Sequence, residues 1–137
     1  MLCLSSTSGN PTNMTPTLVF DIETIPDVAG LRRLHDLPTT LSDHEVAELA
    51  FQRQRAKNGG DFLPHHLHRV ITISCALRSD DGFRVWSMAA PKADEKEIIQ
   101  RFFDGIEKFT PQLVSWNGGG FDLPALHYRA LINGVSA

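Results

Sequence analysis

The chain has 137 residues, of which 42% are hydrophobic, so it has the size of one domain and enough apolar material for a core. Thirteen basic and sixteen acidic residues give a net charge of -3, which argues against a general electrostatic nucleic-acid binder, because such proteins are normally basic. No apolar run approaches the about 20 residues of a membrane span, and two cysteines are too few for a disulfide framework, so we expect a cytoplasmic protein without a membrane partner.

Residues 1–16 are rich in Ser, Thr, Asn and Pro and show no periodicity, which predicts a disordered leader. They also lack the basic region and apolar block of a signal peptide. The folded part is expected over residues 17–137 and opens with a strand at 18–22. Two helix patterns follow, one over 27–35 and one that begins at Ser42, where Glu45 three positions later completes a capping box.

The second half of the chain alternates strands and helices. "RVITISCAL" (69–77) and "FRVWSMA" (83–89) predict a hairpin with a tight turn at 79–82, and "DEKEIIQRFFDGIEKF" (94–109) predicts an amphipathic helix. A strand at 112–117 and a helix at 122–132 complete the order, and Trp86 and Trp116 are expected in the core because they lie in strand patterns. A helical crossover after the hairpin indicates an α/β fold with a mixed sheet, its fourth strand parallel to its first.

Two carboxylates follow the apolar run in "LVFDIET" (18–24). Residues two apart on a strand point to the same side, roughly 6.6 Å apart, so Asp21 and Glu23 share a face. Two anions at that spacing repel unless a cation lies between them, and hard oxygen ligands suit Mg²⁺ or Mn²⁺. The alternative is a solvated strand end, because a bare Asp-x-Glu triplet is common by chance.

A third acid lies in "SWNGGGFDLP" (115–124), where a strand ends and a helix begins. The glycines are not a phosphate-binding Walker loop, since no Gly-Lys-Ser/Thr follows them, and they indicate a turn that something approaches closely. If the two parallel strands are neighbours, Asp122 comes beside Asp21 and Glu23, at the strand ends where open α/β sheets bind ligands. The alternative is that Asp122 only caps the helix.

"FDIET" and "NGGGFD" together closely resemble the first and second motifs of the DEDD (DnaQ-like) 3′–5′ exonucleases. The likeness is greatest to bacterial predicted exonucleases related to the proofreading domain of family B DNA polymerases, and it covers residues 17–137. It implies an RNase H-like mixed sheet flanked by helices, with single-stranded DNA 3′ ends as the substrate and two Mg²⁺ or Mn²⁺ ions as cofactors.

The resemblance also implies roles for single residues. Asp21 would bridge both metal ions, Glu23 would hold the ion on the nucleophile side, and Asp122 would serve the other. The residues implied to contact the 3′-terminal nucleotides or to line the pocket of the terminal base are Asn117, Phe121, Thr24 and Leu123.

One motif of that family has no counterpart in this sequence. The family takes a fourth carboxylate from a third motif, Tyr-x-x-x-Asp or His-x(3–5)-Asp, whereas residues 123–137 contain no acid and Tyr128 is followed four positions later by Ile132. We therefore expect a domain without its final strand and helix, and weak or no nuclease activity from these residues alone. The alternative functions are a non-catalytic nucleic-acid-binding or interaction domain on the same fold, and an RNA-trimming exoribonuclease.

Overall fold

The computed structural model describes residues 2–4 and 14–137. Its described strands form one sheet in the order β1-β5-β2-β3-β4. Their bounds are Leu2–Leu4 for β1, Thr17–Pro26 for β2, His68–Ser79 for β3, Gly82–Ala89 for β4 and Gln112–Ser115 for β5. β2 and β5 pair in parallel, whereas β3 and β4 pair antiparallel around a turn at residues 80–81. The predicted mixed sheet and hairpin are confirmed.

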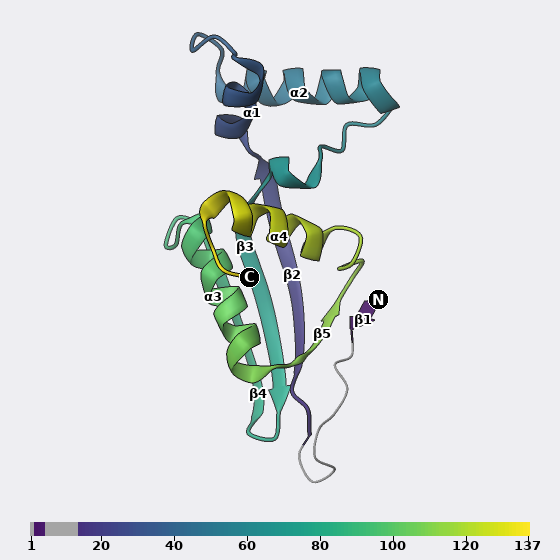
Figure 1. Cartoon of the computed structure of the whole chain (residues 1–137), viewed down its shortest axis with the longest axis vertical. Helices are drawn as coiled ribbons and strands as arrows, with labels where there is room; N and C mark the ends of the chain where they lie inside the picture. Colours follow the sequence, from purple (N-terminus) through teal and green to yellow (C-terminus); the bar gives the residue numbers. More distant parts are fainter. Residues whose placement is uncertain (1, 5–13) are drawn as a thin grey trace. The chain divides into compact units, whose positions relative to one another are not determined.

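Two helices cover one face of this sheet, α3 (Glu95–Phe109) and α4 (Asp122–Asn133) (Figure 1). The sequence pattern explains which face they cover, because Leu18, Phe20 and Ile22 alternate with exposed residues along β2 and point into the core. The same core holds the apolar stripe of α3 and the small and apolar face of α4. The opposite side chains of β2 therefore point away from both helices.

The chain folds as two compact units, one made of the residues up to Thr24 together with Val70–Ala137, and the other of Ile25–Arg69. The second unit contains α1 (Val28–His35), α2 (Asp43–Asn58) and the short 3₁₀ helix η1 (His65–Leu67), which share a small core around Leu31 and Val46. The predicted capping box is present. Glu45 N–H donates to Ser42 Oγ at 3.2 Å, and Ser42 N–H donates to the Glu45 carboxylate at 2.7 Å.

Three differences from the sequence analysis concern the sheet. β2 continues to Pro26 instead of ending at residue 22, and half-buried and exposed residues keep alternating beyond Glu23. β5 ends at Ser115, two residues earlier than expected. Leu2–Leu4, which the expected leader included, pair with β5 as β1, while residues 1 and 5–13 of that leader lie outside the described residues.

No helix in the described ranges 2–4 and 14–137 combines the length and the apolar character that a membrane crossing requires.

Candidate active site

Asp21 and Glu23 both lie on the exposed face of β2. Phe20 and Ile22, which alternate with them, are buried on the face that packs against the helices. The two carboxylates thus share one side of the strand, as the alternation predicts. They lie within the strand and not at its end, because β2 continues beyond them.

β5 ends next to the part of β2 that carries Asp21, the first of these acids. Val19 pairs with Val114, so Phe20 lies level with Ser115, and β5 ends there. Asp21 is therefore the first residue of β2 that β5 no longer accompanies. The turn that follows β5 and the start of α4 lie next to this part of β2.

The turn after β5 is built around Asn117 and a close backbone contact. Asn117 adopts a left-handed conformation with φ of 54°, and its carbonyl accepts hydrogen bonds from the backbone N–H groups of Gly120 and Phe121, both at 3.0 Å. A Cβ atom on Gly118 would lie 2.4 Å from Ser115 Oγ and 3.0 Å from Ser115 Cβ. Glycine is needed here because a side chain of the protein itself, that of Ser115, approaches the backbone.

Asp122 is the first residue of α4 and is buried, with 4% of its surface exposed. The hydroxyl of Ser115 donates to Asp122 Oδ2 over a long 3.5 Å. The N-cap position belongs to Phe121, and no side chain caps this helix end. The alternative that Asp122 serves as the helix cap is therefore wrong.

The negative charge of Asp21 acts on the carboxyl group of Asp122. Burial raises the pKa of Asp122, the negative charge of Asp21 raises it further, and the hydroxyl of Ser115 partly opposes both. Two acids from distant parts of the sequence thus lie close enough to repel each other. Among residues 2–4 and 14–137, no three His, Cys, Asp or Glu side chains are close enough to hold a metal ion together, so Glu23 does not complete a triad with this pair.

The four residues with implied nucleotide contacts differ in exposure. Asn117 is exposed in the turn, and Thr24 is half-buried on β2. Phe121 and Leu123 are half-buried and pack against the core of the sheet. Only part of these two side chains therefore remains available to a ligand.

Two residues at this site were not predicted from the sequence. Ser115 contacts Asp122 through its hydroxyl. Its place at the end of the strand, directly before the second motif, is the feature of the sequence that could have indicated it. Trp116 was expected in the core, which is wrong, since 80% of its surface is exposed. β5 ends at Ser115, so Trp116 is not part of the sheet and its indole is not buried there. Trp86, the other tryptophan, packs against the core as expected.

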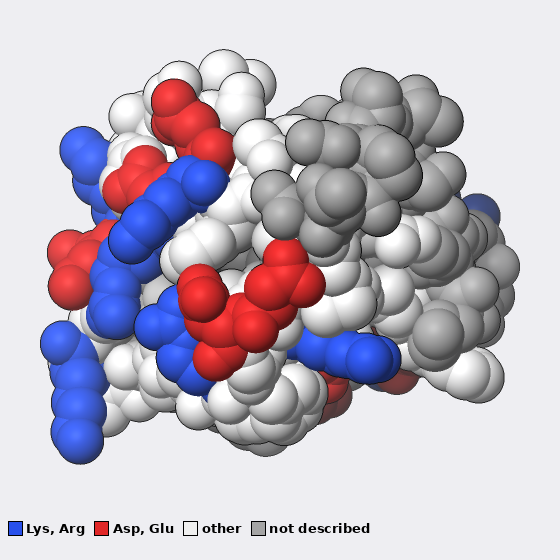
Figure 2. Space-filling view, turned by 90° about the horizontal axis from the view of Figure 1, so that it is seen from below, with Lys and Arg blue, Asp and Glu red and all other residues white. Residues whose placement is uncertain are grey.

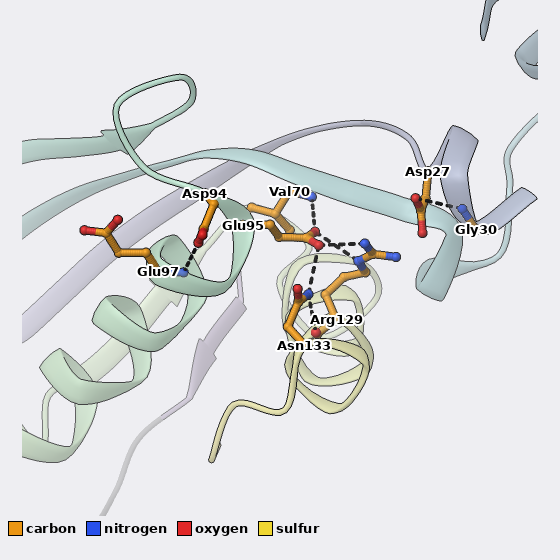
Figure 3. A network of polar contacts seen from close by, with 8 residues as sticks. All are labelled: Asp27, Gly30, Val70, Asp94, Glu95, Glu97, Arg129 and Asn133. Atoms are coloured by element: carbon orange, nitrogen blue, oxygen red, sulfur yellow. Dashed lines mark hydrogen bonds and ion pairs between the residues drawn. The ribbon is translucent and has the colours of Figure 1, made fainter.

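A buried polar network fixes α4, the helix that carries Asp122 (Figure 3). Arg129 Nη2 donates to Glu95 Oε1 at 2.6 Å, and Arg129 Nε donates to Glu95 Oε2 at 2.9 Å. Asn133 Nδ2 donates to the same carboxylate at 2.8 Å, and so does the backbone N–H of Val70 at 2.6 Å. One carboxylate at the start of α3 thus ties α4 and β3 together, which holds Asp122 in place.

The donor set fits a divalent ion. Asp21 and Asp122 supply hard carboxylate oxygens, and their mutual repulsion is what a cation would relieve. Mg²⁺ is commonly held by one or two carboxylates while it keeps several waters, so a pair suffices for a first ion.

The chain is similar to known proteins in both sequence and fold. Residues 60–137 match the model of a family described as a predicted 3′–5′ exonuclease related to the exonuclease domain of PolB. The chain belongs to this family. The matched range contains the turn and Asp122, while Asp21 and Glu23 precede it.

Two DNA polymerases are similar to this member of the exonuclease family. DNA polymerase 1 of Sulfurisphaera ohwakuensis is 49% identical over 37 residues, which are 27% of this chain and 4% of that protein. The family B DNA polymerase of Pyrobaculum calidifontis resembles 89% of this chain with a TM-score of 0.50 and 24% identity, over 12% of its own length. The latter likeness concerns the fold and supports an RNase H-like mixed α/β fold. The chain spans a small part of each polymerase.

Proposed function

We propose that this chain is a metal-dependent 3′–5′ exonuclease domain that hydrolyses phosphodiester bonds at the 3′ end of single-stranded DNA. The observation that supports the proposal is the electrostatic pair of Asp21 on β2 and Asp122 at the start of α4. In a family of predicted 3′–5′ exonucleases, a buried acid whose pKa is raised by burial and by a second acid is a candidate for catalysis.

Two Mg²⁺ or Mn²⁺ ions would supply the chemistry, by activating a water and stabilising the leaving 3′ oxygen. Asp21 would hold both ions, Glu23 would hold the ion on the side of the attacking water, and Asp122 would hold the other. Ser115 orients Asp122 through its hydroxyl, and the network around Glu95 holds the helix that carries it.

The same proposal gives the turn a role in substrate binding. Asn117 is exposed and positioned by its own left-handed turn, so its amide can reach the 3′-terminal nucleotide. Phe121 would contact the same nucleotide with the exposed part of its ring. Thr24 and Leu123 would line the pocket that holds the terminal base.

The test is hydrolysis of a 5′-labelled single-stranded DNA oligonucleotide with Mg²⁺ and the protein in molar excess, because weak turnover is expected from these residues. Products should shorten one nucleotide at a time from the 3′ end. Asp21→Asn and Asp122→Asn should each slow cleavage at least about 100-fold, the scale of losing one electrostatic catalytic group. Asp81→Asn, an exposed acid in the β3–β4 turn, is the matched control and should cleave normally.

A second candidate is a nucleic-acid-binding domain without turnover. It is favoured by the described residues, among which no three His, Cys, Asp or Glu side chains are grouped so that they could hold a metal ion. This candidate predicts oligonucleotide binding that Asp21→Asn leaves intact, without Mg²⁺-dependent cleavage. An RNA oligonucleotide in parallel identifies an exoribonuclease, since the carboxylates serve either nucleic acid.

A further inference from the structure

Trp116 is exposed to a degree that is unusual for its type. It retains 80% of its accessible surface, although tryptophan is large and on average highly buried. The residue before it, Ser115, is buried and faces Asp122. The indole therefore has no role in the core, and burial does not explain why a tryptophan occupies this position.

The position of Trp116 connects it to the acid pair. Val19 pairs with Val114 and β5 ends at Ser115, so Trp116 is the first residue of the turn that leads from β5 to α4. Asp21 is the first residue of β2 beyond the last residue of β5. Ser115, directly before Trp116, contacts Asp122 through its hydroxyl. Trp116 therefore lies on an exposed turn beside the part of the chain that carries the acids.

The charges of the chain make an aromatic contact useful here. The net charge is -3, and Asp21 and Glu23 repel phosphates wherever cations do not neutralise them. Figure 2 shows one face, where Lys and Arg side chains lie among Asp and Glu side chains. Stacking of a base on an aromatic ring does not depend on a basic surface.

We propose that Trp116 is a stacking platform for an unpaired nucleobase of the substrate strand, next to the carboxylate pair. The inference rests on the proposed function and deepens it, since it specifies unpaired nucleic acid and a contact that tolerates any base. Stacking on one aromatic side chain typically strengthens binding roughly 5- to 100-fold. The contact serves DNA and RNA alike, because both present the same ring faces.

The test is the affinity for a phosphorothioate-linked oligothymidylate, which resists hydrolysis, measured by fluorescence anisotropy with Mg²⁺. Trp116→Ala should bind roughly 5- to 100-fold more weakly, and Trp116→Phe, which keeps a ring, should lose less. Phe83→Ala is the matched control, because Phe83 is also aromatic and 67% exposed but lies at the β3–β4 turn, at the other end of the sheet. Circular dichroism of each variant checks the fold.

Tryptophan fluorescence gives a second readout. Bound oligonucleotide should quench the emission of the wild type, and Trp116→Phe should abolish the quench while Trp86 still emits. A loss of affinity that is as large for an oligouridylate supports a platform for either nucleic acid, whereas a loss confined to one of them contradicts a contact that serves DNA and RNA alike.

Equal affinity of Trp116→Ala and the wild type overturns the inference and leaves the proposed function standing, provided that the wild type binds or cleaves. Absence of both binding and cleavage in the wild type overturns the inference and the proposed function together.

Discussion

Arg129 and Glu95 form a bidentate ion pair between α4 and α3, with contacts of 2.6 and 2.9 Å, although 34 residues separate them in the sequence. Both side chains are buried, with 4% and 7% of their surface exposed. Arg129 lies about two helical turns after Asp122 on α4. The pair therefore sets the position of α4, and with it the position of Asp122, whose pKa the charge of Asp21 raises.

Replacing Arg129 by Met should destabilise the fold strongly. The change leaves the carboxylate of Glu95 buried without its cation, which typically costs about 3–5 kcal/mol. Urea denaturation gives the free energy of unfolding. Arg101→Met, at an exposed arginine on α3, is the control and should change it by less than about 0.5 kcal/mol. A similar small change for Arg129→Met would show that the pair does not hold α4.

Asp122→Asn should stabilise the protein while it removes activity. The folded state raises the pKa of Asp122, so it binds a proton more tightly than the unfolded state does. Stability is then greatest below the ordinary pKa of an aspartate and falls as pH rises towards the raised value. The asparagine variant lacks this fall and should be more stable at pH 7 by about 0.5–2 kcal/mol.

Denaturant titrations of Asp122→Asn and the wild type from pH 3 to 8 measure that difference. Asp81→Asn, in the β3–β4 turn, should follow the wild type. Parallel curves for Asp122→Asn and the wild type would contradict the raised pKa of Asp122.

Mg²⁺ should raise the melting temperature of the wild type. A ligand present at ten times its dissociation constant adds about 1.4 kcal/mol of stability, which corresponds to about 3–8 °C in a domain of this size. Neutralising either partner, as in Asp21→Asn or Asp122→Asn, should abolish most of the shift. Differential scanning fluorimetry with NaCl at equal ionic strength as the control separates binding from screening, and equal shifts in all variants would exclude a site at this pair.

Gly118→Ala should destabilise the protein by about 1–3 kcal/mol, because the new Cβ overlaps Ser115. Gly105→Ala is the control, since nothing lies within 4 Å of its added Cβ in α3, and it should stabilise by about 0.5–1 kcal/mol. In a Ser115→Ala background the cost of Gly118→Ala should fall by at least about 0.5 kcal/mol. Additive costs in this double-mutant cycle would place the conflict elsewhere.

Local patterns predicted most of the fold. The alternation around Phe20 and Ile22 placed two acids on one face, and the capping box at Ser42 and Glu45 marked a helix start, because both features depend on neighbours in sequence. The parallel pairing of β2 and β5 followed from the order of elements. The coupling of Asp21 to Asp122 then required only that two strands be neighbours.

Contacts between residues that are far apart in the sequence could not be predicted from it. Nothing near Glu95 or Arg129 indicates that they pair, since the contact depends on how α3 and α4 pack. Trp116 follows an apolar strand, and its exposure depends on where β5 stops, which is set by the pairing with β2. Strand ends and helix contacts are decided by tertiary packing, which a single sequence does not display.

Because core residues and carboxylates alternate along β2, the register of this strand in the sheet is as important as its composition. Inserting or deleting one residue before Phe20 would turn the aromatic ring to solvent and the acids towards α3 and α4. Both the packing of the core and the placement of the acids would be lost. Insertions and deletions in this strand should therefore be tolerated far less than most substitutions of its exposed side chains.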